Sequence, residues 1–423
     1  MNKKIFSITI ALLVIASLLL TACGGKPKGP VTLTIWHNWG PDDAKGPAMK
    51  SILADFMAAN PNIIIKDEVY VDADIPLKVE TASAANQEPD LVFTGRIGSA
   101  YNWTDSGITI DVKDLLSKWG LDDKFQSAAI SQFTQADGKV QAFPLEGYTW
   151  PIWYNTKVFE AAGVAIPQTT DELISAAKTI RAAGFGGPVV ASGADGMGSY
   201  LFTLILQSAM TDAEAEQCMG KGDWTVPNCV KGVELFVQLR DAGVFVDNVE
   251  GIDYPSAEAQ FGTGKVAMCH YGAWAFADPD MLPLNPDVQL GGFPLPAGSP
   301  HKLPVYYAAF TAKGIFITPN GEAKIDAVKK FIQFFYQPEM IARFVEQAGM
   351  TPPLKNVPVD ESKINMLFAQ SLNLNAEVAE TPDMYMPPAV NAVFGPLTQK
   401  AFTPGVTAED ILADLRAAYT AVP

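Results

Sequence analysis

The sequence predicts an α/β protein with two domains, on three observations. Segments with the two-residue apolar repeat of a strand recur between segments with the apolar spacing of a helix. Of the 423 residues, 401 remain once a presumed signal of 22 residues is removed, which is too many for one compact core of ordinary size. Apolar residues make up 48% of the chain and charged residues 18%, which are the proportions of a globular protein.

The N-terminus has the three parts of an export signal. Residues 1–4 carry two lysines, residues 5–20 are apolar or small, and Thr21 and Ala22 lead directly into Cys23. A basic start, an apolar core and small residues before a cysteine are typical of a bacterial lipoprotein signal peptide. The pattern predicts cleavage before Cys23, lipid on Cys23, and a mature chain anchored to the outer face of the cell membrane. The alternatives are an ordinary secretory signal and a single membrane anchor, and both still export the chain.

Residues 23–30 are expected to form a lipidated tether. Cys23 is followed by Gly-Gly-Lys-Pro-Lys-Gly-Pro, in which glycine is conformationally loose and proline lacks a backbone N–H. No later apolar stretch has the length of a membrane span, so the chain from Val31 onward is expected to be water-soluble. Loss of Lys3 and Lys4 with the signal changes the formal charge from −16 to −18. This acidic balance argues against nucleic acid as a partner, although a local arginine can override it for a small anion.

The N-terminal part of the mature chain predicts strands and a helix in alternation. Residues 31–35 alternate apolar and polar side chains, as in a strand with one buried face. Residues 48–59 place apolar side chains on one helical face, and the Asn-Pro-Asn at 60–62 ends that helix. Residues 63–71 and 91–93 predict two further strands, which completes a first α/β unit.

A second α/β unit begins in the middle of the chain. Residues 138–155 predict a turn followed by a long extended segment. A helix then starts at Thr170, because Thr169 and Glu172 have the spacing of a capping box, and it runs out before Gly184. Further helix patterns lie at residues 233–240, 327–335 and 411–418, and further strand patterns at residues 266–271 and 314–318.

The cysteines that remain after lipidation of Cys23 fall into a pair and a single residue. Cys218 and Cys229 bracket a short loop rich in glycine, and a disulfide between them would contribute about 3 kcal/mol by the loop-entropy argument. Cys269 lies in an apolar run and is expected to be a small core residue. Because the chain has three histidines and no cysteine or histidine pairs at ligand spacing, we expect no metal site and no cofactor.

The tryptophans give the clearest chemical indication. Trp36, Trp39, Trp150, Trp153 and Trp274 all lie next to glycine, proline or asparagine at predicted strand ends. Side chains at such positions tend to face a cleft, and an indole face packs well against the apolar C–H face of a pyranose ring. The pattern therefore favours a site for a neutral polyol. The alternative for each tryptophan taken singly is a place in the hydrophobic core.

Eight segments carry a resemblance to a known family. They lie at residues 36–39 (WHNW), 88–93 (EPDLVF), 137–144 (DGKVQAFP), 154–159 (YNTKVF), 163–173 (GVAIPQTTDEL), 261–268 (FGTGKVAM), 272–274 (GAW) and 351–354 (TPPL). In this order, behind a lipoprotein signal, they resemble the extracellular solute-binding proteins of carbohydrate ABC importers, which include maltose-binding and multiple-sugar-binding lipoproteins. The resemblance implies a periplasmic-binding-protein-like fold of type II, with two α/β lobes joined by hinge strands around a ligand cleft.

The resemblance also implies how the chain divides between the lobes. The expected division is a signal peptide at 1–22, a tether at 23–30, a first lobe at 31–144 with 310–350, and a second lobe at 145–309 with 351–423. The expected crossings between the lobes lie near residues 145–149, 306–310 and 351–355.

Several ligand-binding residues follow from the resemblance. Trp274, two residues after Gly272, matches the stacking aromatic of the family. Arg96 matches a hydrogen-bonding arginine at the lip of the first lobe, for which the alternative is a surface ion pair. Asn38 and Trp39 lie in the loop after the first strand, where the family commonly contacts sugar.

Further candidates lie along the first hinge segment and in the second lobe. Glu146, Tyr148 and Trp150 are expected at the floor of the cleft, and the alternative for Glu146 is a solvated carboxylate at a strand edge. Trp224 and Tyr306 are additional cleft candidates.

The function implied is that of a monomeric, lipid-anchored receptor that closes on a mono- or oligosaccharide and presents it to an ABC permease, without covalent chemistry. The sequence departs from the maltose-binding relatives at Gly95, where those carry an acidic residue, so the identity of the sugar stays open. The alternatives are a receptor for another polar solute such as a glycerol phosphodiester, a structural surface lipoprotein, and a secreted glycoside hydrolase that uses Glu146 and Asp90 as acid and base.

Overall fold

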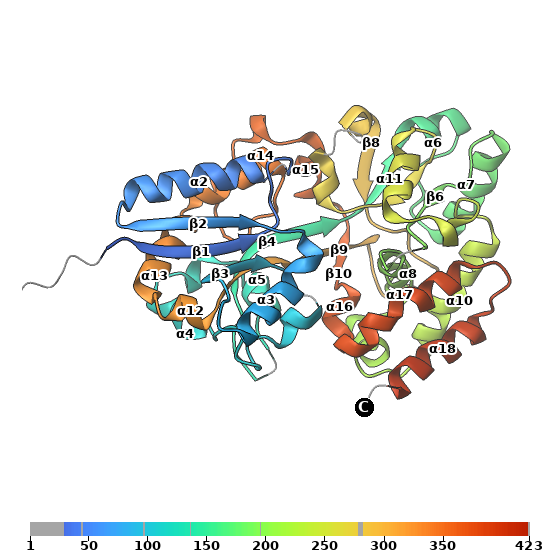
Figure 1. Cartoon of the computed structure of the whole chain (residues 1–423). Coiled ribbons are helices and arrows are strands. Elements are labelled where there is room, and N and C mark those ends of the chain that lie inside the picture. Colours follow the sequence, from blue (N-terminus) through green and yellow to red (C-terminus); the bar gives the residue numbers. More distant parts are fainter. Residues whose placement is uncertain are drawn as a thin grey trace, which may run out of the picture.

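The chain forms two α/β lobes that lie side by side, with strands running between them (Figure 1). The computed structural model describes residues 29–43, 45–95, 98–135, 137–194, 196–277 and 282–421. The predicted signal peptide, the lipidation site Cys23 and the predicted ligand-binding residue Arg96 lie outside these residues. Within them, no helix combines the length and the apolar content that a bilayer span requires.

The first sheet has the strand order β10-β9-β3-β1-β2, and β4 pairs with β9 beside this row. Its strands are β1 (Val31–His37), β2 (Ile63–Val69), β3 (Leu91–Thr94), β4 (Phe143–Trp150), β9 (Val305–Ile317) and β10 (Glu377–Ala379). β1 pairs in parallel with β2 and with β3, and β9 runs antiparallel to β3. The buried residues of β1 alternate with more exposed ones, which confirms the strand predicted at residues 31–35.

Helices from distant parts of the chain cover this sheet. In the first lobe they are α2 (Gly46–Ala59), η1 (Asp72–Asp74), α3 (Ile75–Ala84), η2 (Gly98–Asn102), α4 (Lys113–Lys118), η3 (Asp122–Lys124), α5 (Ser127–Gln132), α12 (Pro319–Glu322), α13 (Ile325–Phe335) and α14 (Pro338–Ala348). α2 packs on α13 and α14, where Phe56 meets Phe331 edge to face with ring centroids 5.2 Å apart. The predicted apolar face of α2 is therefore buried, although its last member, Ala59, is exposed at the end of the helix.

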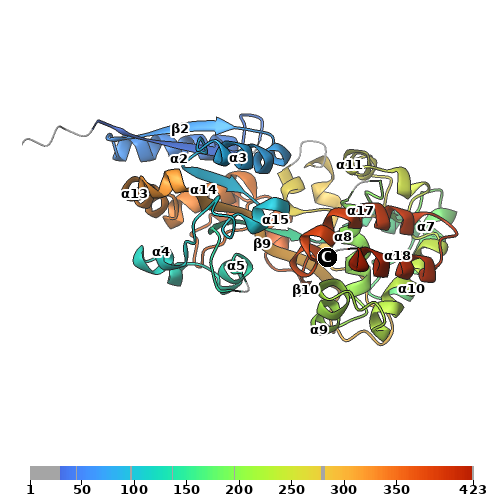
Figure 2. The ribbon, with the colours of Figure 1, turned by 60° about the horizontal axis from the view of Figure 1, so that its bottom comes forward.

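The second sheet has the order β6-β7-β5-β8. Its strands are β5 (Ile152–Asn155), β6 (Val189–Val190), β7 (Met268–His270) and β8 (Val288–Gly291). The helices on this side are α6 (Thr156–Ala162), α7 (Thr170–Ala182), α8 (Gly198–Gln207), α9 (Asp212–Ala215), the π-helix η4 (Glu216–Gly220), α10 (Pro227–Asp241), η5 (Val249–Gly251), α11 (Tyr254–Gly262), η6 (Ala273–Ala277), η7 (Leu282–Asp287), α15 (Met366–Ser371), α16 (Pro382–Tyr385), α17 (Pro388–Phe402) and α18 (Ala408–Thr420), whereas η8 (Glu361–Lys363) packs on α14 of the first lobe. α8, α10, α17 and α18 pack together in this lobe, as Figures 1 and 2 show from two sides.

The helix predicted after Thr169 is present as α7, with both hydrogen bonds of the capping box. Thr169 Oγ1 accepts the backbone N–H of Glu172 at 3.2 Å, and Glu172 Oε2 accepts the backbone N–H of Thr169 at 3.2 Å. In the same lobe Cys218 and Cys229 form a disulfide between η4 and α10, with Cα atoms 6.5 Å apart. Cys269 is a buried free thiol in β7, and burial raises its pKa well above the usual value.

Two long strands connect the lobes. β4 pairs with β9 from Phe143 opposite Ile315 to Trp150 opposite Tyr307, and β5 starts the second sheet two residues after β4 ends. The register of the β4 and β9 pair breaks on both sides of Glu146. Such irregularities bend a strand, so this is where the connection departs from a straight ladder.

Candidate functional site

Five rings meet where β4 leaves the first sheet and the second sheet begins. This aromatic cluster consists of Tyr148 and Trp150 on β4, Tyr200 on α8, His270 on β7, and Trp274 in η6. The cluster thus joins three distant parts of the chain: β4, α8, and the segment that contains β7 and η6. It lies at the junction of the lobes, where the resemblance placed the ligand.

Trp150 forms the inner part of the cluster. Its side chain is only 3% exposed. Tyr200 stacks on it with ring centroids 4.4 Å apart and planes at 30°, and His270 stacks on it at 4.9 Å and 17°. Because these rings already cover the indole, Trp150 has no free face for a ligand and acts as a support.

Trp274 is the outer member and presents an open indole. It is 40% exposed and stands nearly perpendicular to Trp150, at 5.1 Å and 74°, and to Tyr148, at 6.0 Å and 72°. Its Nε1–H donates a 2.7 Å hydrogen bond to the hydroxyl of Tyr254. The ring also lies over Gly272, since a Cβ on that residue would come within 2.1 Å of it. The glycine before the tryptophan therefore provides the space in which the indole lies.

The polar groups of the cluster are uncharged at neutral pH. Burial raises the pKa of the Tyr148 hydroxyl and that of the Tyr200 hydroxyl well above the usual value, and Tyr200 is also hydrogen-bonded to Asp383. Burial lowers the pKa of His270 to about 3, although a hydrogen bond to the Trp150 backbone opposes the shift. The cluster thus offers neutral hydroxyl and imidazole groups rather than fixed cations.

Two ion pairs lie along the β4 and β9 connection. Lys45 Nζ is 2.9 Å from Glu146 Oε1, and both side chains are largely buried. Burial opposes the charge on Lys45, but Glu146, helped by Asp43 and Asp72, raises its pKa above the usual value. On the neighbouring strand Lys313 is paired with Asp72. Lys45 and Lys313 are therefore already matched by carboxylates of the protein.

Other predicted ligand-binding residues lie away from the aromatic cluster. Trp39 is 2% exposed and packs against Phe344 at 5.2 Å in the core of the first lobe. Trp224 is fully buried next to Tyr419. On β9 it is Tyr307 that approaches His270, at 5.9 Å, so its neighbour Tyr306 points to the other face of the strand. The structure thus brings Tyr148, Trp150, Gly272 and Trp274 together. Trp39, Trp224 and Tyr306 do not join them. 

The loop with Asn38 and Trp39 is fixed by a buried histidine. His37 Nε2 lies 2.6 Å from Asp67 Oδ1, and His37 Nδ1 accepts the backbone N–H of Trp39 at 3.0 Å. A cavity of about 440 Å³ opens beside this loop, between the ends of β1 and β2 and the start of α2. Asn38 Oδ1 is buried and has no hydrogen-bond partner among the described residues.

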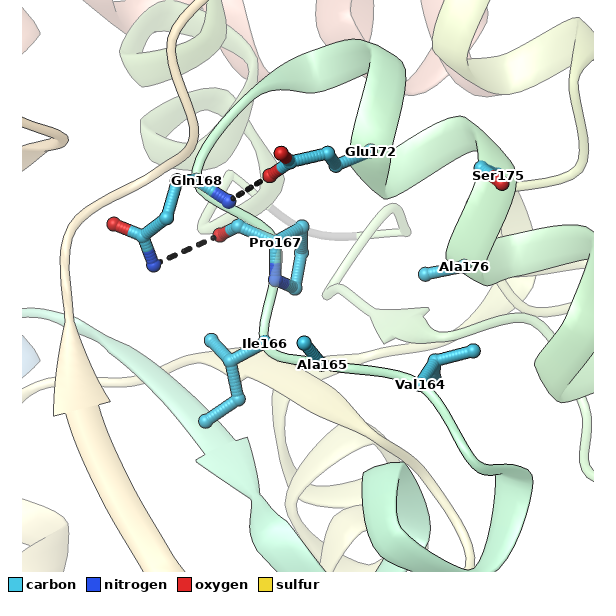
Figure 3. A pocket seen from close by; sticks show the side chains of 8 residues that line it. All are labelled: Val164, Ala165, Ile166, Pro167, Gln168, Glu172, Ser175 and Ala176. Carbon is cyan, nitrogen blue, oxygen red and sulfur yellow. Dashed lines mark hydrogen bonds between the residues drawn. The ribbon is translucent and has the colours of Figure 1, made fainter.

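A second cavity, of about 430 Å³, lies beside the start of α7 (Figure 3). Its floor is formed by residues 164–167, and Glu172 is its charged side chain. The Glu172 carboxylate accepts the backbone N–H of Gln168 at 2.8 Å and that of Thr169, as part of the helix cap. The one charged side chain that lines this cavity among the described residues therefore caps helix α7. Within the residues described, no three histidine, cysteine or carboxylate side chains are grouped to hold a metal ion.

Sequence reasoning missed three members of this region: Tyr200, His270 and Tyr254. His270 lies in the strand predicted at residues 266–271 and ends the observed strand β7, two residues before Gly272, so its position could have indicated it. Tyr200 lies on a helix surrounded by apolar residues, and Tyr254 starts another helix. Nothing in their local sequence separates them from ordinary packing residues.

Two α/β lobes joined by a pair of strands, with an open aromatic surface at the junction, define a two-lobed binding-protein fold. The chain belongs to the family of bacterial extracellular solute-binding proteins, whose model matches residues 40–342. Members of this family bind solutes outside the cytoplasm, so the chain is a binding protein and not an enzyme.

Solved structures and curated relatives agree with this assignment. A probable secreted solute-binding lipoprotein from Streptomyces coelicolor is 34% identical, with a TM-score of 0.84, over 93% of this chain and 100% of that chain. A chitin oligosaccharide binding protein is 25% identical, with a TM-score of 0.77, over 93% and 98% of the two chains. The melibiose/raffinose/stachyose-binding protein MelE of Bacillus subtilis is 21% identical over 92% of this chain and 89% of its own length.

Proposed function

We propose that the protein is an extracytoplasmic receptor that binds a mono- or oligosaccharide between its lobes and delivers it to an ABC import permease. The observation that carries this proposal is the open indole of Trp274 at the junction of the lobes, backed by buried rings. A pyranose stacks its C–H face on such an indole, while nearby neutral hydroxyls bind its hydroxyl groups.

The charge of the region supports a neutral ligand. Lys45 is paired with Glu146, Lys313 is paired with Asp72, and His270 is uncharged near pH 7. A phosphodiester requires cations that are free to bind its oxygens. The described residues thus favour a sugar over a glycerol phosphodiester.

The names of similar proteins point the same way. One relative is named for binding melibiose, raffinose and stachyose, and one similar structure is named for binding chitin oligosaccharide. These names support an oligosaccharide as the ligand class of this chain.

Closure of the lobes would convert binding into a signal that the permease recognises. We assign the lobes to residues 31–144 with 310–350 and to residues 145–309 with 351–423, connected through the β4 and β9 pair. A ligand that contacts both lobes stabilises only their closed arrangement, so it shifts the population toward that shape. Gly147 packs so closely on Phe310 that a Cβ would come within 2.7 Å of its ring, which makes this a well-defined pivot.

The attachment to the membrane is part of the same proposal. The basic, apolar and small-residue pattern before Cys23 supports lipidation there, and the Streptomyces coelicolor protein is itself described as a lipoprotein. Expression of the full chain in a bacterial host with labelled palmitate should give a labelled protein in the membrane fraction. Cys23→Ser should abolish the label, and a label that persists in this variant would contradict the assignment.

The test of the main proposal is a thermal-shift screen of the mature chain with mono- and oligosaccharides, followed by calorimetry. A sugar at 100 times its dissociation constant should add about 2.7 kcal/mol to the free energy of unfolding. Glycerol phosphodiesters form the comparison set. Stabilisation by a phosphodiester and by no sugar would overturn the proposal.

A further inference from the structure

The indole of Trp274 is held by contacts on its edge and on one face. Its Nε1–H donates to Tyr254 Oη at 2.7 Å, and its six-membered ring lies against Gly272. The inner part of the ring faces Trp150 at 5.1 Å in an edge arrangement. Of these contacts, the hydrogen bond is the directional one, because it fixes the rotation of the ring about its Cβ–Cγ bond.

Tyr254 is itself fixed to the strand that leads to Trp274. It is the first residue of α11, which Asp253 caps by accepting the backbone N–H of Ser256 at 2.9 Å. The Tyr254 carbonyl accepts the hydroxyl of Tyr271 at 3.1 Å, and the two rings meet edge to face at 5.0 Å. Tyr271 directly precedes Gly272, so α11 and the segment that carries Trp274 are connected at two points.

We propose that Tyr254 is a positioning residue for sugar binding. Its hydroxyl sets the plane of the Trp274 indole and so keeps one face open to the ligand, without contact between Tyr254 and the ligand. This inference rests on the proposed function, since it concerns the same stacking surface.

The physical reason is the entropy of an exposed aromatic ring. The outer torsion of tryptophan is broad, and the other contacts of this 40% exposed side chain, with Trp150, Tyr148 and Gly272, are packing contacts without a preferred direction. A ring that rotates must be ordered when sugar binds, and this ordering weakens binding. The hydrogen bond to Tyr254 preorganises the ring in the unliganded protein, so its rotation does not have to be restricted when sugar binds.

The test is a double-mutant cycle with Tyr254→Phe and Trp274→Phe, measured by calorimetry with a sugar that the wild-type protein binds. Tyr254→Phe keeps the ring and removes the hydroxyl, and we expect roughly two- to tenfold weaker binding, as for the loss of one hydrogen bond. Trp274→Phe has no N–H to position. In that background Tyr254→Phe should therefore have no further effect on affinity.

A second readout reports the ring itself and needs no ligand. The indole N–H proton resonance that disappears in Trp274→Phe is assigned to Trp274. In Tyr254→Phe this resonance should move upfield and exchange faster with solvent, because its acceptor is gone. Tyr419→Phe is the matched control, because it removes a hydroxyl on α18 that donates to the Met219 carbonyl of η4. It should change neither affinity nor the resonance.

Two results separate the possible failures. Suppose that the wild-type protein binds sugar. If the Tyr254→Phe variant then binds it equally well, or if Tyr254→Phe weakens sugar binding equally with Trp274 and with Phe at residue 274, the positioning role is refuted and the receptor function stands. If the wild-type protein binds no sugar of the screen, the proposed function is refuted and this inference falls with it.

Discussion

The substitution Gly272→Ala tests the stacking surface most directly, because it moves the indole without removing it. A methyl group at residue 272 would lie 2.1 Å from the Trp274 ring, whereas carbon atoms in contact are about 3.5 to 4.0 Å apart. The ring must therefore move by roughly 1.5 Å, which the side chain can do because it is 40% exposed. The backbone of residue 272 lies outside the left-handed region, so alanine itself is not strained there.

The magnitude follows from the surface that the ligand would cover. Forty per cent of a tryptophan side chain of about 250 Å² is about 100 Å², and at 25 cal/mol per Å² its burial is worth about 2.5 kcal/mol. Loss of this contact should weaken sugar binding roughly 50-fold. The free energy of unfolding should change by less than about 1 kcal/mol, since the displaced ring turns toward water.

The assay is calorimetry for affinity and urea unfolding for stability, on the same preparations. Gly186→Ala is the matched control, because a Cβ at that position meets open space. It should leave the affinity unchanged. If Gly272→Ala bound sugar as tightly as the wild type, the ligand would not lie on Trp274, and the reasoning would be wrong.

Three further outcomes follow from the described contacts. Hydrogen bonds from His301 and from two backbone N–H groups lower the pKa of Glu377. The ionised carboxylate therefore stabilises the fold at neutral pH, and this contribution is lost as the pH falls through the lowered pKa. Glu377→Gln should flatten that part of an acid-unfolding curve. Lys45→Met leaves the largely buried Glu146 carboxylate without its partner and should cost about 3 kcal/mol in urea unfolding, with most of the loss recovered when Glu146→Gln is added. Reduction of the disulfide described above should lower the free energy of unfolding by about 3 kcal/mol, and no change would show that the bond does not constrain the unfolded chain.

Sequence patterns predicted local structure well because its causes are local. The strand at residues 31–35 and the capping box of Thr169 and Glu172 depend on neighbours within a few positions, and both are present. Trp39 and Trp274 have the same local signature, a small or polar neighbour at a strand end. Trp39 is nevertheless 2% exposed, because Phe344, from a helix about 300 residues further along the chain, packs on it.

The candidate site shows the same limit. Tyr148, Trp150, Gly272 and Trp274 could be named from motifs, but their roles could not be told apart. Trp150 supports the cluster and is not open to a ligand, because Tyr200 stacks on it. Tyr200 lies on a helix whose sequence gives no sign of this contact. Contacts of this kind depend on tertiary packing, which no local spacing encodes.

The burial of Trp39 and Trp150 affects how strongly an empty receptor would tend to close. If an empty protein closed and covered Trp274, it would gain up to about 2.5 kcal/mol from that indole alone. Each further indole exposed on the facing walls would add a similar amount, and four of them would favour closure by about 10 kcal/mol without any sugar. A ligand needs about 5.5 kcal/mol of differential affinity to move such an equilibrium from 1:99 to 99:1. With Trp39 and Trp150 buried, the gain from covering Trp274 alone stays below that value, so this indole would not populate the closed form by itself and the sugar would still be needed.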